Sequence, residues 1–130
     1  MASILVVDDE LEMCDLLQAL LEPAGHRVVT TTEPRDVIHL LEASAFDLVI
    51  ADVVMPRRDG IELVKELRQK SPQLGIIAMS GAKPLRRELF FEAGRQFGAD
   101  ATFGKPFSKE EVLGSVAEAL KKAADRKAVA

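Results

Sequence analysis

The sequence predicts one α/β domain in which a five-stranded parallel sheet carries helices on both faces. Five short apolar segments alternate with five longer segments whose apolar residues recur at helical spacing. This alternation is typical of repeated strand–helix–strand units. Three of the short segments are almost wholly aliphatic, as strands covered on both faces require. The length of 130 residues suits a single domain with its own core.

The predicted strands differ in how apolar they are, and this difference orders them in the sheet. They lie at residues 4–7, 26–31, 48–51, 76–79 and 101–103. The first, third and fourth are the most apolar and are expected at the centre. The second and fifth are short or half polar and are expected at the edges. The order 2-1-3-4-5 meets this condition, which is the doubly wound arrangement of flavodoxin-like folds.

Each predicted strand is followed by a predicted helix with an apolar stripe. The residues expected to face inward are Met13, Leu16, Leu17, Leu20 and Leu21 in the first helix, Val37, Ile38 and Leu41 in the second, Ile61, Val64 and Leu67 in the third, Leu85, Leu89, Ala93 and Phe97 in the fourth, and Val112, Val116, Leu120 and Ala124 in the fifth. Phe90 is also at core spacing, whereas the spacing does not assign Phe91 to the core or to the surface. Ser108 and Glu111 form a predicted capping box for the fifth helix.

The composition argues against several classes of function. The net charge of −4 gives no general surface for nucleic acid, so direct nucleic-acid binding is not expected. Cys14 is the only cysteine, and no signal-peptide pattern precedes the first strand, which together favour a reducing, cytoplasmic location. No apolar run approaches the ~20 residues of a membrane span, so no membrane association is expected.

Chemically capable side chains follow four of the predicted strands. The central strands end in Asp8-Asp9, Asp52 and Ser80, and the last strand ends just before Lys105. Because the carboxyl ends of parallel strands meet at one edge of a sheet, these groups are expected to converge. Clustered carboxylates repel one another unless a divalent cation such as Mg²⁺ joins them. With an ammonium and a hydroxyl added, the pocket suits a phosphoryl group, which Asp52 would accept as an aspartyl phosphate.

Each part of this constellation also has an ordinary interpretation. A lone Asp at a strand end is usually solvated, an acidic triplet at a helix start often complements the helix dipole, and a Ser before Gly is usually part of a turn. Their joint occurrence at the ends of four successive parallel strands is what favours the phosphoryl site.

The motifs that carry this constellation resemble the receiver domain of two-component response regulators, a family that includes the single-domain chemotaxis regulator. The resemblance covers residues 3–124, nearly the whole chain. Its pieces are Val6-Val7-Asp8-Asp9-Glu10, Asp52-x-x-Met55-Pro56-x-x-Asp59-Gly60, Met79-Ser80-Gly81, Gly98-Ala99-Asp100 and Lys105-Pro106-Phe107.

The resemblance implies a metal-dependent phospho-acceptor. Asp52 would be the acceptor, and Mg²⁺ (or Mn²⁺) would be bound by Asp9, Asp52 and the main-chain carbonyl of Val54. Asp8 would act on the metal through water.

The resemblance also implies roles for groups around the phosphoryl oxygens. Ser80 would hold one of these oxygens in the active state, and Lys105 would pair with the phosphoryl group. The Lys105–Pro106 peptide bond is expected to be cis.

The resemblance further implies a signalling switch rather than an enzyme with turnover. A histidine kinase or phosphotransfer protein would supply the phosphoryl group, with only self-catalysed transfer and slow autodephosphorylation by the chain itself. A downstream protein would bind through the fourth helix, fifth strand and fifth helix, and a phosphorylation-dependent dimer is possible for such a domain. Residues 1–124 would form the receiver domain, and 125–130 a flexible tail or the start of a linker. Whether the domain stands alone or was cut from a longer protein stays open.

Three positions depart from the commoner pattern of the family. Thr102 stands where an aromatic switch residue is usual, and Phe103 should face the other side of its strand. Thr102 therefore either switches differently or couples weakly to the output face. Val54 and Ala82 put apolar side chains where water would approach in line with the phosphoryl bond, which predicts a long-lived phosphorylated state.

Three other functions are less consistent with the residues. A phosphatase of the haloacid-dehalogenase kind needs a second Asp two residues after the nucleophile, and Val54 is there instead. A flavodoxin-like nucleotide binder needs a phosphate loop after the first strand, where the acidic triplet would repel phosphate. A fold kept only for protein docking would not need the complete acidic and lysine set.

Overall fold

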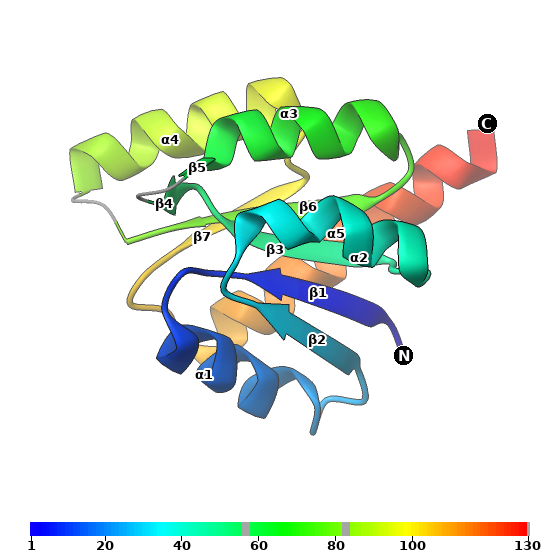
Figure 1. Ribbon diagram of the computed structural model, residues 1–130, viewed down its shortest axis with the longest axis horizontal. Coiled ribbons are helices and arrows are strands. Elements are labelled where there is room, and N and C mark those ends of the chain that lie inside the picture. The colour runs from blue at the N-terminus through cyan, green and yellow to red at the C-terminus, as the bar shows by residue number, and fades with distance from the viewer. Residues whose placement is uncertain (56–57, 82–83, 130) are drawn as a thin grey trace.

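The computed structural model describes residues 1–55, 58–81 and 84–129. Its main sheet has the order β2-β1-β3-β6-β7, and all neighbouring strands are parallel (Figure 1). The strands are β1 (Ser3–Val7), β2 (Arg27–Thr31), β3 (Leu48–Asp52), β6 (Gly75–Ser80) and β7 (Ala101–Gly104). The predicted fold class and strand order are therefore confirmed. A small antiparallel ladder of β4 (Val54–Met55) and β5 (Arg58–Asp59) adds to them, in a stretch where no strand was predicted.

Helices cover both faces of the sheet, as predicted. They are α1 (Leu11–Leu21), α2 (Val37–Ala43) after a short 3₁₀ turn at Pro34–Asp36, α3 (Gly60–Lys70), α4 (Pro84–Phe97) and α5 (Lys109–Val129). In Figure 1, α3 and α4 lie above the strands and α1 lies below them, while α5 passes behind the sheet. Residues of α1 and α5 pack in one core layer, and those of α2 and α3 in the other. Helix α5 continues past residue 124, so the domain boundary placed there stays a prediction.

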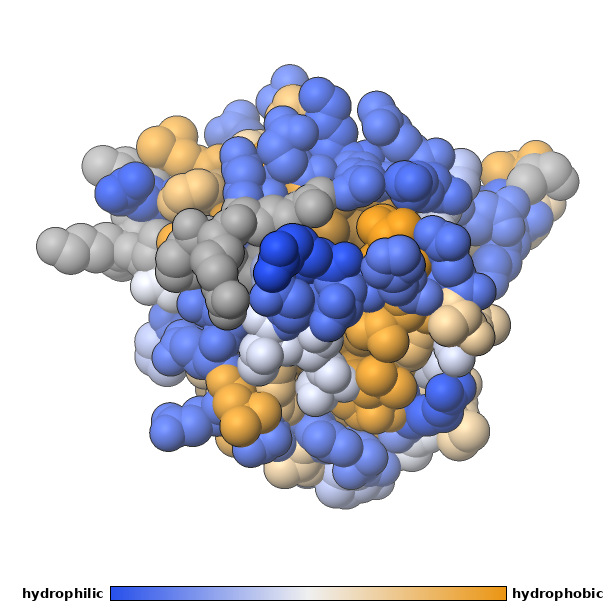
Figure 2. Space-filling view, viewed as in Figure 1, coloured by the Kyte–Doolittle hydropathy of each residue, from blue (hydrophilic) through white to orange (hydrophobic). Residues whose placement is uncertain are grey.

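The core consists of two layers, one on each face of the sheet. Alternate residues of a strand point to opposite faces. Accordingly, Ile4 and Val6 pack in the layer under α1 and α5, whereas Leu5 and Val7 pack in the layer under α2 and α3. The view in Figure 2 shows mostly hydrophilic residues on the surface, with apolar residues in smaller areas between them. No helix in the described part of the chain combines the length and apolar character needed to cross a membrane.

The predicted buried face of α4 is wrong in part. Leu89 is 65% exposed and Phe97 is 38% exposed, although both were expected inward. Phe97 instead lies under the ammonium of Lys65, 5.2 Å from the ring centroid. The side chain of Leu85 lies outside the described residues.

The face of α4 that packs inward carries the aromatic pair and a glycine. Phe91 is 7% exposed, and Phe90 is partly buried against the core, as its spacing predicted. A Cβ on Gly94 would lie 3.3 Å from the Cβ of Ala78, so the absence of a side chain lets α4 approach the sheet. Apolar residues lie on more than one side of α4, and spacing alone could not identify the buried side.

Two smaller corrections concern α1 and α5. Leu16 is 47% exposed, whereas Cys14 on α1 is fully buried. In α5 the buried stripe continues from Val112 and Val116 to Ala119 and Ala123. The predicted Leu120 is partly buried against the core, whereas the predicted Ala124 is exposed. A stripe spaced strictly four residues apart drifts around a helix of 3.6 residues per turn, so the buried face follows mixed steps of three and four.

The amino-terminal edge of the sheet contains a buried ionic cluster that the sequence did not predict. Asp100, just before β7, accepts hydrogen bonds from both terminal nitrogens of Arg126 at 2.6 and 3.0 Å and from Arg68 at 3.1 Å. The backbone N–H of Ile76 donates to the same carboxylate at 3.0 Å. Arg68 also donates to the carbonyls of Gly98, Pro72 and Leu74. This cluster ties α3, β6, β7 and α5 together.

Candidate functional site

The predicted site residues lie at the carboxyl-terminal edge of the sheet. Asp52 is the last residue of β3 and Ser80 is the last residue of β6. Asp8 follows β1 directly, and Lys105 follows β7 directly. Asp8, Asp52 and Ser80 are buried, with exposed fractions of 0%, 3% and 0%. Three polar side chains are therefore buried together at the carboxyl-terminal edge of the sheet.

Lys105 joins two of the carboxylates directly. Its Nζ lies 2.6 Å from Oδ2 of Asp8 and 2.9 Å from Oδ2 of Asp52. A third carboxylate, that of Glu10, lies 3.7 Å away with its side chain 67% exposed. One ammonium thus bridges the ends of β1 and β3 from the end of β7.

The second oxygen of each bridged carboxylate is held by the backbone. The N–H of Val54 donates to Oδ1 of Asp52 at 2.8 Å, and the N–H of Glu10 donates to Oδ1 of Asp8 at 2.9 Å. Both carboxylates are consequently fixed in orientation before any ligand binds. Such fixed acceptors are the arrangement expected for a site whose chemistry depends on positioning.

Burial dominates the electrostatics of the site. Desolvation raises the pKa of Asp8 and the pKa of Asp52 above the ordinary value, although the hydrogen bonds from Lys105 and the backbone oppose it. Burial alone would lower the pKa of Lys105, but its hydrogen bonds to the two carboxylates outweigh burial and raise it. The carboxylates are therefore short of positive charge, which is the condition under which an added cation is favourable.

The acidic residues after β1 form a group that could hold a metal ion. Ligand oxygens of Asp8, Asp9 and Glu10 lie within 4.8 Å of one another. Carboxylate oxygens are the donors that Mg²⁺ prefers, so this donor set fits the ion. Glu10 was not among the predicted ligands, and its position directly after the paired aspartates was the only signal for it.

Ser80 and Thr102 lie on the strands beside the acidic pocket. The carbonyl of Ser80 accepts a hydrogen bond from the N–H of Lys105 at 2.8 Å, which ties the lysine's backbone to β6. Thr102 is partly buried, and its Oγ1 accepts a long hydrogen bond of 3.4 Å from Arg95. Phe103 is buried on the other face and packs edge-on against Phe107, with ring centroids 5.2 Å apart. The Lys105–Pro106 peptide bond is cis, as the resemblance implied.

The loop after Asp52 is fixed by the start of α3. A Cβ on Gly60 would lie 2.2 Å from Cα of Val53 and 2.7 Å from the carbonyl oxygen of Asp52. Only glycine permits this approach. Asp59 caps the helix by accepting the N–H of Ile61 at 2.9 Å.

Val54 and Ala82 are the two positions predicted to flank the approach of water to Asp52. Val54 is 41% exposed, so its apolar side chain lies at the solvent side of the loop after Asp52. Ala82 and Pro56 lie outside the described residues.

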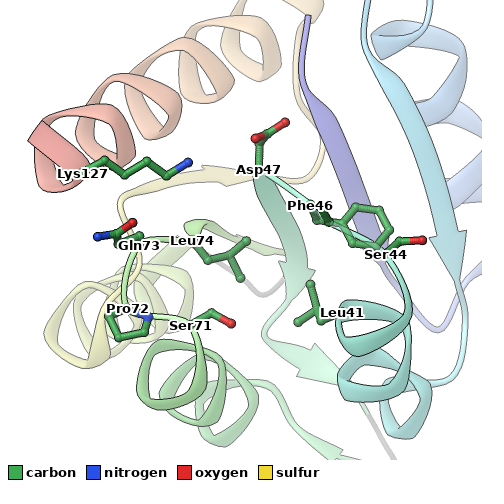
Figure 3. A pocket seen from close by; sticks show the side chains of 10 residues that line it. Leu41, Ser44, Phe46, Asp47, Ser71, Pro72, Gln73, Leu74 and Lys127 are labelled. Carbon is green, nitrogen blue, oxygen red and sulfur yellow. The ribbon is translucent and has the colours of Figure 1, made fainter. Parts of the chain in front are cut away.

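A cavity lies at the opposite edge of the sheet, away from the acidic pocket. Figure 3 shows Leu41, Phe46 and Leu74 around it, with Asp47 and Lys127 along one side. Its volume is about 440 Å³, yet none of its lining residues belongs to the acidic pocket. The chemistry of the Asp52 site therefore comes from its cluster of charged side chains and not from this cavity.

Comparisons with known proteins agree with this geometry. The family described as "Response regulator receiver domain" matches residues 4–117. The chain is 36% identical over 119 residues to the alkaline phosphatase synthesis transcriptional regulatory protein PhoP of Bacillus subtilis, covering 92% of this chain and 48% of that protein. It is 34% identical over 122 residues to the transcriptional regulatory protein CpxR of Escherichia coli, covering 94% of this chain and 50% of that one. The chain thus spans about half the length of these curated relatives.

Solved structures give the same result. The chemotaxis protein CheY4 of Vibrio cholerae superposes with a TM-score of 0.79 at 28% identity, covering 90% of this chain and 97% of that one. NtrX of Brucella abortus, crystallised in complex with ADP, superposes with a TM-score of 0.89 at 27% identity, covering 98% of this chain and 29% of that one. On the strength of its fold, its acidic pocket and the family match over residues 4–117, the chain belongs to the response regulator receiver domain family.

Proposed function

We propose that this receiver domain accepts a phosphoryl group on Asp52 and thereby switches its contacts with other proteins. The observation that carries this proposal is the bridge from Lys105 to Asp8 and Asp52, at 2.6 and 2.9 Å. It holds a buried carboxylate beside a mobile positive charge that can follow a phosphoryl oxygen. Membership of the receiver domain family supports phosphoryl acceptance in general.

The donor is a phosphohistidine of a histidine kinase or phosphotransfer protein. An oxygen of Asp52 attacks phosphorus and forms a new P–O bond, while the P–N bond to the donor imidazole breaks and its electron pair stays on nitrogen. Lys105 then pairs with a phosphoryl oxygen, and the hydroxyl of Ser80 donates to another. Positioning and charge neutralisation account for most of the catalysis in such transfers.

Receiver domains bind Mg²⁺ at an acidic pocket, and the donors of this chain suit that ion or Mn²⁺. Asp9, Asp52 and the carbonyl of Val54 would hold the metal directly, and Asp8 through water. When bound, the ion neutralises charge on the phosphoryl oxygens. Glu10 belongs to the same acidic group and would support the ion from the exposed side.

The output of the switch is a change in protein contacts. Ser80 and Thr102 are the proposed switch residues, and the face of α4, β7 and α5 is the proposed surface for a downstream protein or a phosphorylation-dependent dimer. Phosphorylation would act by shifting the population between conformations of this face. Residues 1–124 are the proposed functional unit, working in the cytoplasm without direct contact to nucleic acid or membrane.

Intact mass after incubation with Mg²⁺ and a small acyl phosphate tests the acceptor. The chain should gain one phosphoryl group, and the gain should vanish in Asp52→Asn or when the metal is chelated. Asp47→Asn, the same substitution at the other end of β3, is the matched control and should keep the adduct. An adduct that persists in Asp52→Asn would refute the assignment.

The lifetime of the adduct tests the role of Val54. Because an apolar side chain there cannot orient an attacking water, Val54→Asn should speed loss of the phosphoryl group by about tenfold. The decay of the adduct mass over time measures this rate. Equal decay in both proteins would show that residue 54 does not limit hydrolysis.

A further inference from the structure

A polar hollow lies between α4 and β7, beside the Asp52 pocket but separate from it. Its volume is about 310 Å³, and its lining includes Arg87 and Arg95 from α4 and Thr102 and Gly104 from β7. None of the carboxylates of the acidic pocket lines it. Unlike the Asp52 pocket, whose one lysine faces several carboxylates, this hollow holds two arginines and two glutamates.

Arg87 lies directly over Gly104. A Cβ on Gly104 would meet Nη1 of Arg87 at 2.7 Å and its Cδ at 2.8 Å, so the arginine occupies space that any larger residue would take. The side chain of Arg87 is partly buried. Within the described part of the chain, no hydrogen bond or ion pair contacts its guanidinium. Its N–H donors are thus left for a ligand or for water.

Arg95 adds a second guanidinium to the same hollow. It lies eight residues after Arg87, about two turns along the same face of α4. Its one hydrogen bond within the described residues is the long contact of 3.4 Å to Thr102, and no described carboxylate lies within ion-pair distance. Glu88 and Glu111 line the same hollow, but no described ion pair joins either of them to these two arginines. Two guanidiniums without an ion-pair partner are stabilised by an added anion.

The rim of the hollow limits which anion fits. Glu88 and Glu111 also line it, and Glu111 is already engaged, since its carboxylate accepts the N–H of Ser108 at 3.2 Å in the capping box. These two carboxylates oppose the approach of an extended polyanion such as nucleic acid. A short acidic segment that places one carboxylate between the two guanidiniums brings far fewer negative charges to this rim than nucleic acid does.

We propose that this hollow binds a carboxylate side chain from an acidic segment of a partner protein, with Arg87 and Arg95 as the recognising groups. Gly104 and Pro106, which line the hollow, flank Lys105 on either side. Binding there is therefore coupled to the charge on Asp52. This coupling rests on the proposed phosphorylation of Asp52, whereas the binding itself does not. Thermodynamic reciprocity requires that phosphorylation and acidic-segment binding alter each other's affinity by the same factor.

The binding is tested by NMR titration of the ¹⁵N-labelled chain with a blocked tetraglutamate peptide, and with a tetraglutamine peptide as control. The amides of Thr102 and Gly104 and the Nε–H of Arg87 should shift saturably with tetraglutamate only. Arg87→Gln should weaken binding by about tenfold. Arg86→Gln is the matched control, because Arg86 is an exposed neighbour on α4 that does not line the hollow.

A second variant removes the site without changing the charge. In Gly104→Ala the new Cβ would displace the guanidinium of Arg87, so the affinity for tetraglutamate should fall while the net charge stays the same. Equal weakening by Arg86→Gln and Arg87→Gln, or unchanged affinity in Gly104→Ala, would overturn the proposal in favour of general electrostatic attraction. Shifts at these residues that depend on the concentration of the chain alone would overturn it in favour of a second copy.

The coupling is tested with phosphorylated chain whose adduct has been verified by mass. Its affinity for tetraglutamate should differ by about fivefold or more from that of the unphosphorylated chain. Equal affinities would overturn the coupling. Failure to form any adduct would instead count against phosphorylation of Asp52, and the titrations of the unphosphorylated chain would still decide whether the hollow binds carboxylates.

Discussion

The two edges of the sheet both gather buried acidic and basic side chains, but they balance charge in opposite ways. At the amino-terminal edge one carboxylate, Asp100, meets two guanidiniums. At the carboxyl-terminal edge one ammonium, Lys105, meets two buried carboxylates and the more distant Glu10. The first edge has a surplus of hydrogen-bond donors, and the second has a surplus of acceptors.

This difference decides which edge needs a ligand. The surplus donors of Arg68 and Arg126 are taken up by main-chain carbonyls, including that of Leu74. In the described residues, only Nε of Arg126 is a buried side-chain donor without a partner. Surplus carboxylates cannot be neutralised by carbonyls, and the two backbone N–H groups that serve Asp8 and Asp52 carry no net charge. The Asp100 cluster, whose donors find acceptors within the protein, stabilises the fold. The Asp8–Asp52 cluster has too few positive charges for its carboxylates and can therefore bind a cation.

The largest expected effect is loss of stability when the Asp100 cluster is broken. Asp100→Ala leaves two largely buried guanidiniums without their carboxylate and should lower the free energy of unfolding by about 3 kcal/mol. That figure is at the low end for such pairs because Arg126 is 33% exposed. Urea unfolding measures the change. Asp47→Ala removes an exposed carboxylate at the same edge and should cost less than about 1 kcal/mol; equal losses in the two variants would contradict the assigned role of Asp100.

The same kind of substitution at the other edge should have the opposite sign. Burial raises the pKa of Asp52, so its ionised form is unfavourable in the folded protein without metal. Asp52→Asn should therefore raise the unfolding midpoint in metal-free buffer. Asp59→Asn is the control, since Asn is as good an N-cap as Asp, and it should change stability by less than about 0.5 kcal/mol. A lower midpoint in Asp52→Asn would show that the Lys105 bridge stabilises more than burial costs.

The pH dependence of stability sharpens the contrast. A carboxyl whose pKa is raised in the folded state contributes most below its ordinary value of 3.8 and loses that contribution as the pH rises through its folded value. The stability advantage of Asp52→Asn over the native chain should thus be small near pH 4 and grow toward pH 8. Unfolding curves across this range give the difference. Measurements stay below pH 9, because the raised pKa of Lys105 adds stability that is lost only at alkaline pH. A constant difference would contradict the assigned pKa direction.

The smallest expected effect belongs to His26 at the amino-terminal edge. Its Nδ1 accepts the N–H of Ala2 at 3.2 Å, and burial lowers its pKa below the ordinary 6.5. Its contribution is present above that ordinary value and is lost as the pH falls through it, because the unfolded chain then binds the extra proton. In His26→Asn, which keeps an acceptor that does not titrate, the stability loss between pH 7 and 5 should be shallower. Identical slopes in thermal unfolding would exclude this contribution.

The sequence predicted the edge that needs a ligand better than the edge that does not. Asp8, Asp52 and Ser80 each follow an aliphatic strand, so topology alone brings them to one edge, whatever the details of packing. The Asp100 cluster depends on Arg126, which lies in the part of the chain predicted to be a tail, and on Arg68 at a helix end. Nothing in the local pattern distinguishes these arginines from solvated ones.

Burial within helices was predictable only where one side alone is apolar. Val64 and Leu67 in α3 are buried as predicted, since the other side of that helix is charged. In α4 the apolar residues lie on several sides, and contact with the sheet selected Phe91 over Leu89. The Lys105 bridge to Asp8 also escaped prediction, because lysine side chains are long enough to reach either carboxylate.

The ammonium of Lys105 links the charge at the end of β3 to the charge at the end of β1. Because it is shared between Asp8 and Asp52, negative charge added at Asp52 draws it away from Asp8. Asp8, at the end of β1, then loses its ion pair although nothing on β1 itself has changed. The turn that follows β7 is the part of the chain that must move with the ammonium. A local change at one carboxylate is thus read out by two neighbouring strand ends.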